Sequence, residues 1–337
     1  MSRYIRPILQ SGPGRPAGAF CLGGGWTWFT HVEVLSRDSD VRVASAQEIT
    51  EAEHAALTLA RSDISSLSMD QPRVMGILNV TPDSFSDGGK HNSLETALEG
   101  ARAMSGADIL DIGGESTRPG AEVVAEHEEI ERTAPVIEAL RTSGVTTTLS
   151  IDTRKAEVAK AALDAGADLV NDVSGFTYDQ RMAPLCASAD APVCIMHAQG
   201  DPATMQNDPH YENVLLDVYD FLAQRVEALI AQGVSKDRII VDPGIGFGKT
   251  LEHNLTLLAR LSLFHSLGVP LLLGASRKRF IGTISGEDVA ARRMPGSLAV
   301  ALAALKHGTQ IVRVHDVPET VQAIALWRAA MAGHADG

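Results

Sequence analysis

Short apolar runs, each ending on polar side chains, alternate with helical patterns from about residue 71 onward. A continuous apolar run is typical of a strand that is covered on both faces. Eight such strands are predicted, at residues 74–79, 109–111, 148–152, 169–172, 193–197, 239–242, 271–276 and 311–313. Six of them follow a Gly that closes a predicted helix, at Gly106, Gly144, Gly166, Gly233, Gly268 and Gly308. Gly is preferred there because the residue that ends a helix often takes a left-handed conformation.

Apolar positions spaced three and four residues apart predict a helix after each strand. These helices are expected near residues 93–104, 128–142, 154–165, 180–188, 212–231, 251–266, 296–307 and 318–331. Eight strand–helix units without an antiparallel pattern predict an α/β fold, a closed (β/α)8 TIM barrel over residues 71–337. Catalytic groups of such barrels lie at the carboxyl ends of the strands.

Residues 1–70 do not share this rhythm. They contain a run of three Gly residues beside Trp26 and Trp28, then a mixed charged segment, and then a predicted helix near residues 46–60. A barrel needs only roughly 250 residues, so this segment is predicted to be an N-terminal extension of unknown role. A cover packed on the barrel is favoured over an independent domain.

The overall composition excludes several classes of partner. A formal net charge of -13 argues against a surface made for nucleic acid or anionic lipid, because either needs a broad basic field. The most apolar stretch, residues 297–305, is far shorter than the roughly 20 residues that cross a bilayer. Cys21, Cys186 and Cys194 lack the spacing of a disulfide framework or a zinc site. Together these features predict a cytoplasmic protein without a membrane span.

Polar side chains at the strand ends are the candidates for chemistry, because they converge on one mouth of a barrel. They are Asn79, Asp111, Asp152, Asn171, His197, Asp242, Ser276, Lys278, Arg313 and His315. Any one of them has an ordinary alternative as a helix cap or turn former. Eight strand ends with hydrogen-bonding groups together predict a binding site.

The segment from Asp242 to Thr250 superficially resembles a phosphate-binding loop. The loop pattern needs a Gly at position 243, where this chain has Pro, and Gly244 is one place too close to the Gly-Lys-Thr sequence. A tight turn that lets a flat ligand approach is the better interpretation. Asp242 would then accept hydrogen bonds from a donor-rich heterocycle, and Phe247 would form an apolar wall.

The cationic residues near the last two strands predict a phosphate site. Lys278 stands between Arg277 and Arg279, while Arg313 and His315 end the eighth strand. In barrels the connections after strands seven and eight are a frequent phosphate site. A solvated basic turn and, for Lys278, a Schiff-base role remain as alternatives. Likewise, His197 is either a ligand or, with more weight, a hydrogen-bonded structural residue.

Seven motifs in order along the chain carry a family resemblance. They are Met75–Gly89 (MGILNVTPDSFSDGG), Asp111–Gly120 (DIGGESTRPG), Ser150–Arg154 (SIDTR), Asn171–Asp172, Asp242–Lys249 (DPGIGFGK), Ser276–Lys278 (SRK) and Arg313–His315 (RVH). On these motifs, residues 73–317 resemble the dihydropteroate synthases of the pterin-binding barrel family. The resemblance implies that 6-hydroxymethyl-7,8-dihydropterin diphosphate is joined to p-aminobenzoate, giving 7,8-dihydropteroate and diphosphate.

The resemblance also implies a role for each matching residue. Asp152, Asn171, Asp242 and Lys278 would hold the pterin ring, with Ser276 in the same motif as Lys278 and with Met196 and Phe247 beside the ring. Asn79, Arg313 and His315 would contact the diphosphate, and Asn79 would contribute an oxygen to Mg²⁺, which such a substrate brings with it. Phe85, Asp87, Thr117, Arg118 and Pro119 would build the p-aminobenzoate pocket. Asp152, Lys278, Arg313 and His315 are the residues expected to carry catalysis.

The resemblance has further implications, and the chain departs from the family at two points. The family implies a homodimer through barrel helices. It is also a sulfonamide target, but the residues themselves do not show whether this chain is sensitive to sulfonamides. Arg279 stands where some members have Ser, and the N-terminal extension is longer than the family core requires. The alternatives are another pterin-binding barrel, such as a methyltetrahydrofolate methyltransferase, or a barrel that binds pterin without turnover.

Overall fold

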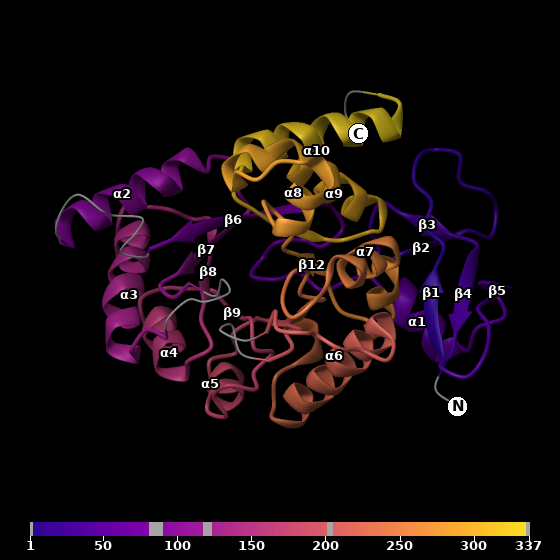
Figure 1. Ribbon diagram of the computed structural model, residues 1–337, viewed down its shortest axis with the longest axis horizontal. Helices are drawn as coiled ribbons and strands as arrows, with labels where there is room; N and C mark the ends of the chain where they lie inside the picture. Colours follow the sequence, from indigo (N-terminus) through magenta and orange to yellow (C-terminus); the bar gives the residue numbers. More distant parts are fainter. Residues whose placement is uncertain (1–2, 81–89, 117–122, 201–204, 335–337) are drawn as a thin grey trace.

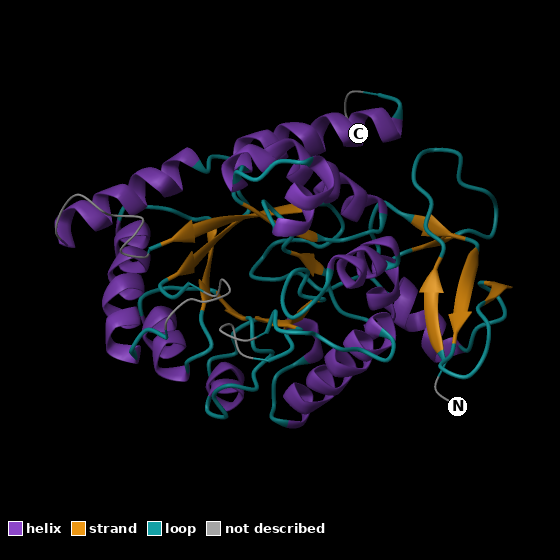
Figure 2. Ribbon diagram, in the orientation of Figure 1, coloured by secondary structure: helices purple, strands orange, loops and turns teal. Residues whose placement is uncertain are grey.

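The central feature of the molecule is a barrel of eight parallel strands inside a ring of helices (Figure 2). The computed structural model describes residues 3–80, 90–116, 123–200 and 205–334. The barrel strands are β6 (Arg73–Asn79), β7 (Ile109–Gly113), β8 (Thr148–Asp152), β9 (Leu169–Asp172), β10 (Val193–Met196), β11 (Ile239–Asp242), β12 (Leu272–Leu273) and β13 (Ile311–Val314). Their order is β11-β10-β9-β8-β7-β6-β13-β12, and a parallel bridge between Val241 and Leu271 closes the ring. The predicted (β/α)8 barrel is confirmed.

The helices follow the strands in sequence and surround them (Figure 1). They are α2 (Lys90–Ala103), α3 (Glu126–Thr142), α4 (Ala156–Asp164), α5 (Met182–Ser188), α6 (Val214–Ala231), α7 (Leu251–Ala259), α8 (Arg279–Ser285), α9 (Met294–Lys306) and α10 (Val317–Ala332). Short 3-10 helices are η2 (Lys236–Arg238), η3 (Leu261–Leu267) and η4 (Ala290–Arg293). All six Gly residues predicted to close helices have a positive φ.

The helices differ from the prediction at two places. The helix expected over residues 251–266 is divided into α7 and η3, because the backbone at Arg260 leaves the helical region with φ -124°. The seventh unit contains an additional helix, α8, which the prediction placed in a connection. Gly286 ends α8 in the left-handed conformation, with φ +73°.

The amino-terminal end of the barrel is sealed by apolar side chains. Residues near the starts of seven strands form one buried cluster, namely Met75, Ile109, Leu169, Cys194, Ile240, Leu272 and Ile311. Ile64 and Met69, which precede the first barrel strand, belong to the same cluster and are 0% and 1% exposed. A ligand must therefore approach from the carboxyl ends of the strands.

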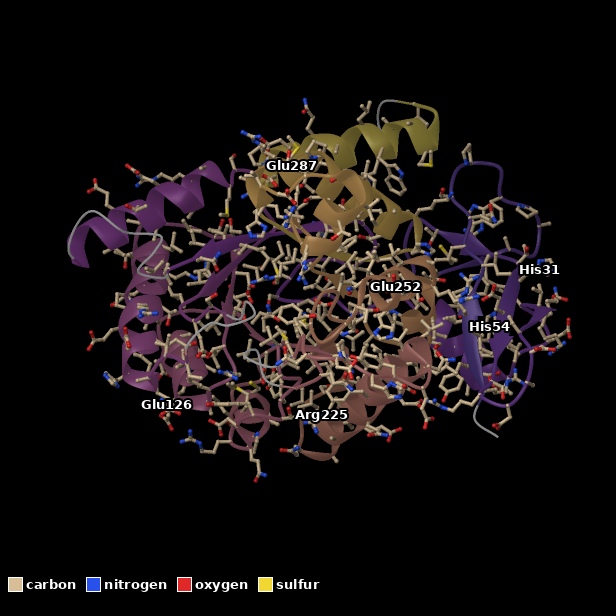
Figure 3. The ribbon with its side chains drawn as sticks, viewed as in Figure 1. His31, His54, Glu126, Arg225, Glu252 and Glu287 are labelled. Atoms are coloured by element: carbon tan, nitrogen blue, oxygen red, sulfur yellow. The ribbon has the colours of Figure 1, made fainter. Side chains whose placement is uncertain are left out.

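The N-terminal extension contains strands that its sequence did not predict. β1 (Tyr4–Pro7), β4 (His31–Leu35) and β5 (Arg42–Ser45) form an antiparallel sheet, and β2 (Phe20–Cys21) pairs with β3 (Trp28–Phe29). The helix expected over residues 46–60 is shorter, α1 (Glu51–Thr58), because Thr50 and Glu53 form a capping box that sets its start. Figure 1 shows this unit beside the barrel, and Figure 3 labels His31 and His54 within it.

Hydrogen bonds join the extension to the barrel. Ser262 Oγ in η3 donates to the carbonyl of Pro7 at 2.9 Å, and Trp26 Nε1 donates to the carbonyl of Leu305 in α9 at 2.9 Å. The guanidinium of the buried Arg61 donates to the carbonyl of His265 in η3 at 3.0 Å. The extension thus packs on the outside of the barrel as well as closing its base.

The described part of the chain contains three cysteines and no disulfide. Cys21, Cys186 and Cys194 are free thiols, and the last two are fully buried. None of the helices described here has the length and apolar character that a bilayer crossing requires.

Candidate active site

Backbone register brings the predicted pterin residues into neighbouring positions at the barrel mouth. Asp152 at the end of β8 lies opposite Asn171 in β9. Met196 at the end of β10 lies opposite Asp242 at the end of β11. Each of these side chains is nearly buried.

Arg313 organises the first of two charged groups at this mouth. Its Nε lies 2.6 Å from Asp111 Oδ2, and its Nη2 lies 2.7 Å from Asp152 Oδ2. Asn171 Nδ2 also donates to Asp111 Oδ2, at 3.1 Å. Among the residues that the structure describes, the buried Oδ1 atoms of Asp111 and Asp152 have no hydrogen-bond partner. Two acceptor oxygens are thus left over in a site rich in carboxylates.

Burial raises the pKa of Asp152 to about 7. The guanidinium of Arg313 opposes this rise, while the neighbouring Asp111 carboxylate adds to it. The carboxyl of Asp152 therefore gains or loses its proton near neutral pH. In this pH range, a charged ligand bound beside it has the largest effect on its protonation.

The second charged group consists of Asp242 and Lys278. Asp242 Oδ1 accepts from the backbone N–H of Gly244 at 2.7 Å, and burial raises the pKa of this carboxyl. Lys278 Nζ donates to the carbonyl of Ile245 and lies 4.4 Å from the centre of the Phe247 ring. Burial lowers the pKa of Lys278 to about 8, against the pull of Asp242.

The neighbours of Lys278 in sequence do not share its environment. Arg277 forms an ion pair with Asp316, with Nε 3.0 Å from Oδ2, and Arg279 is exposed. Besides burial, the cation that lowers the pKa of Lys278 is therefore Arg313, which is distant in sequence, and not Arg277 or Arg279.

Ser276 and His315 form a smaller contact between the ends of two neighbouring strand segments. Ser276 Oγ accepts from the backbone N–H of His315 at 3.2 Å and lies 3.0 Å from His315 Nδ1. This bond fixes the position of the imidazole beside the end of β13.

Asn79 is the last residue of β6, and it is exposed. Asn79 Oδ1 and Asp152 Oδ2 both lie 3.8 Å from the point that a Cβ of residue 113 would occupy. Within the described ranges, no three His, Cys, Asp or Glu side chains gather into a metal cluster. Oxygen atoms of this kind fit Mg²⁺ as a minor part of its shell, with phosphate and water supplying the rest.

His197 is a structural residue of the site. Its Nδ1 lies 2.9 Å from Lys249 Nζ, and its ring packs edge-on against Phe221 at 4.9 Å. Burial, with the nearby Lys249 cation, lowers the pKa of His197 to about 2. The favoured interpretation of a hydrogen-bonded His agrees with this neutral ring.

Five residues assigned to the p-aminobenzoate pocket lie outside the described residues: Phe85, Asp87, Thr117, Arg118 and Pro119. Their roles stay predictions, as do the roles of the residues located above. Sequence reasoning named Asp111 among the polar strand ends without giving it a specific role, and it gave no role to Lys249. Asp111 was visible as a carboxylate in an apolar strand. Lys249 was visible only as the last residue of the Asp242–Lys249 motif, and nothing in that motif indicated that its side chain is buried.

Comparison with known proteins fits this geometry. Residues 75–315 match the family model described as pterin binding enzyme. That match covers most of the chain. The chain belongs to the pterin-binding enzyme family. A relative named dihydropteroate synthase from Synechocystis sp. is 50% identical over 261 residues, which are 76% of this chain and 90% of the relative.

Solved structures of this family have the same fold as this chain. The dihydropteroate synthase of Xanthomonas albilineans with 4-aminobenzoic acid has a TM-score of 0.75 and 45% identity, covering 81% of this chain and 98% of that one. The Yersinia pestis dihydropteroate synthase with a sulfonamide drug complex has a TM-score of 0.74 and 46% identity, covering 78% and 96%.

Proposed function

We propose that this chain is a dihydropteroate synthase. It joins 6-hydroxymethyl-7,8-dihydropterin diphosphate to p-aminobenzoate in folate biosynthesis, and it releases diphosphate. The observation that carries the proposal is the contact of both Asp242 and Lys278 with one turn at the barrel mouth, residues 244–245. The chain is also 50% identical over 261 residues to a named synthase.

The chemistry of the pterin ring matches these two residues. A pterin presents a ring N–H and an amino group side by side, which are donors to the carboxylate of Asp242. It also presents a carbonyl oxygen, which accepts from the ammonium of Lys278. Phe247 offers an apolar face beside them.

The reaction breaks the carbon–oxygen bond to diphosphate and forms a carbon–nitrogen bond to the arylamine, which then loses a proton. Negative charge grows on the leaving diphosphate, and groups that meet it only then stabilise the transition state. Arg313 and His315 would supply cationic and donor groups there. Mg²⁺, held in part by Asn79, would neutralise the phosphate oxygens when bound.

Asp152 suits the positive charge that develops on the pterin as the bond breaks. Its carboxylate is buried beside Asp111, so an approaching cation would find two acceptor oxygens without partners. The arylamine of p-aminobenzoate is already a nucleophile at neutral pH. The reaction therefore needs no strong base.

Assembly, location and inhibition complete the proposal. A homodimer through barrel helices is supported by exposed apolar side chains on two of them, Ile284 of α8 and Leu326 of α10, which are 60% and 72% exposed. The three free thiols suit a reducing cytoplasm. Sulfonamides would bind this chain, because the similar Yersinia pestis enzyme forms a sulfonamide drug complex.

The deciding experiment supplies purified protein with both substrates and Mg²⁺ and measures 7,8-dihydropteroate by chromatography. Product that depends on both substrates is the expected result. Binding of the pterin diphosphate without product would favour a non-catalytic barrel. Methyl transfer from methyltetrahydrofolate, with no dihydropteroate formed, would favour the methyltransferase alternative.

A further inference from the structure

Lys249 has a buried side-chain nitrogen that is surrounded by hydrogen-bond acceptors, and burial lowers the pKa of this group well below its usual value. The residue is 3% exposed, and its Nζ lies 2.9 Å from the carbonyl of Gly244, 3.0 Å from that of Phe247 and 3.3 Å from that of His197. The fourth neighbour is His197 Nδ1, at 2.9 Å. In the part of the chain that the structure describes, the hydrogen-bond partners of Lys249 Nζ are carbonyl oxygens and an imidazole nitrogen, with no carboxylate among them. Because burying such a cation costs free energy, its position calls for an explanation.

The turn around Lys249 has an unusual backbone. Gly244, Gly246 and Gly248 all have positive φ, at +68°, +83° and +61°. A Cβ on Gly244 would lie 1.9 Å from the carbonyl oxygen of His197, and one on Gly248 would lie 2.6 Å from that of Gln199. The turn therefore lies directly against the segment that follows β10. The ammonium of Lys249 bonds to carbonyls of both segments and joins them.

The opposite side of this turn contacts the predicted pterin residues. The N–H of Gly244 donates to Asp242. The carbonyl of Ile245 accepts from Lys278, and the ring of Phe247 lies under the same ammonium group. Movement of the turn would thus displace three groups assigned to the pterin.

We propose that Lys249 is a positioning residue of the pterin site. Its ammonium holds residues 244–248 against the segment after β10, and this turn then sets the places of Asp242, Phe247 and Lys278. The inference rests on the proposed function, because it assumes that these three groups meet the pterin. Lys249 acts through the turn and not on the reacting atoms, so its loss should weaken pterin binding selectively.

Arg225 in α6 provides a matched control. It performs the same structural task for another turn, donating from Nε to the carbonyl of Gly175 at 2.8 Å and from Nη2 to that of Phe176 at 3.1 Å. Figure 3 labels it on the lower side of the molecule. The two residues whose carbonyls it holds have no predicted role in pterin binding. Replacing Arg225 should lower stability without a selective effect on either substrate.

The test compares Lys249→Met, Lys249→Gln and Arg225→Met with the unmodified protein. KM is measured for each substrate in turn. In Lys249→Met we expect KM for the pterin diphosphate to rise tenfold or more while KM for p-aminobenzoate stays within twofold. Lys249→Gln keeps two N–H donors for the carbonyls. Its KM for the pterin diphosphate should therefore lie between the values of Lys249→Met and the unmodified protein. Arg225→Met should change neither KM by more than twofold.

Two outcomes would overturn the inference. One is a folded Lys249→Met protein with an unchanged pterin KM, or with an equal rise in both KM values. The other is failure of both Lys249 variants to fold by circular dichroism, which would assign the residue to stability alone. Calorimetric titration with the pterin diphosphate gives Kd without turnover, so an unmodified protein that binds it but makes no product would defeat the proposed function and leave the inference testable.

Discussion

Arg313 Nη2 lies 2.7 Å from Asp152 Oδ2, although the two residues are 161 positions apart in the chain. The strands that carry them, β13 and β8, are separated by β6 and β7 in the barrel. The same guanidinium also bonds to Asp111 of β7. One cation therefore connects three strands inside the mouth and compensates two buried carboxylates.

The first prediction concerns removal of this cation. Arg313→Met leaves Asp111 and Asp152 buried without their partner, and breaking a buried pair in this way costs about 3–5 kcal/mol. We expect a loss of that order in the free energy of unfolding, together with loss of turnover. Urea unfolding and the product assay measure the two effects separately.

A second variant separates stability from chemistry. Arg313→Met combined with Asp111→Asn removes one of the unpaired charges, so it should recover part of the lost stability without recovering turnover. If the double variant regains activity, Arg313 has no role at the diphosphate. If the single variant is as stable as the unmodified protein, the ion pairs seen here are not formed in solution.

The second prediction follows from the titration of Asp152. Its pKa in the folded state, about 7, lies above the ordinary value of 3.8, so the folded protein holds this proton more tightly than the unfolded chain. The contribution of Asp152 to stability is then full below about pH 4, declines as pH rises toward 7 and is lost above it. Turnover should change in the opposite direction, because the ionised carboxylate is the form that stabilises a developing cation.

Asp152→Asn isolates this contribution. The free energy of unfolding is measured for both proteins between pH 4 and pH 8, and the difference between them should change in this interval. The unmodified protein should lose stability relative to the variant as pH rises. Parallel curves would mean that the pKa of Asp152 is not raised. The rate of product formation by the unmodified protein should increase over the same interval and level off above pH 7.

The sequence predicted the barrel well because parallel strands are covered on both faces and so read as apolar runs. Gly268 and Gly308, for example, precede two of these runs and have a φ of +77° in both cases. The strands of the extension gave no such signal. β2 and β3 have two residues each, and in β5 Arg42 and Val43 are exposed, so no apolar run forms.

The candidate site was predictable as a set of residues but not as a set of contacts. Strand ends converge in any barrel, which is why Asp152, Asp242 and Lys278 could be grouped from the sequence. That Arg313 bonds to Asp111 depends on the order of strands around the ring and on the reach of its side chain. The proposed role of Lys249 depends on the geometry of the 244–248 turn, which the order of residue types does not specify.

The third prediction concerns Asp242. Asp242→Asn keeps the size of the side chain but replaces one acceptor oxygen with a donor group, which then faces the donors of the pterin. We expect Kd for the pterin diphosphate to rise at least tenfold in calorimetric titrations. Asp164→Asn, at an exposed position of α4, serves as the control and should bind like the unmodified protein. Unchanged affinity in Asp242→Asn would remove this residue from the pterin site.

The fourth prediction concerns the role of the extension at the base of the barrel. Ile64 and Met69 fill the end of the barrel core, and truncating a buried side chain of this size costs about 2–5 kcal/mol. Ile64→Ala and Met69→Ala should each lower the free energy of unfolding by that amount in urea, while Ile64→Val should cost only about 1 kcal/mol.

Deletion of residues 1–70 tests the same idea at the level of the whole extension. Met75, Ile109 and Ile311, which are fully buried at the amino ends of their strands, would then face water. The shortened chain should therefore be recovered unfolded or aggregated, as judged by circular dichroism and size-exclusion chromatography. A shortened chain with unchanged stability and turnover would show that the barrel closes its base without the extension. Leu59→Ser, at a position that is 65% exposed, should be as stable as the unmodified protein.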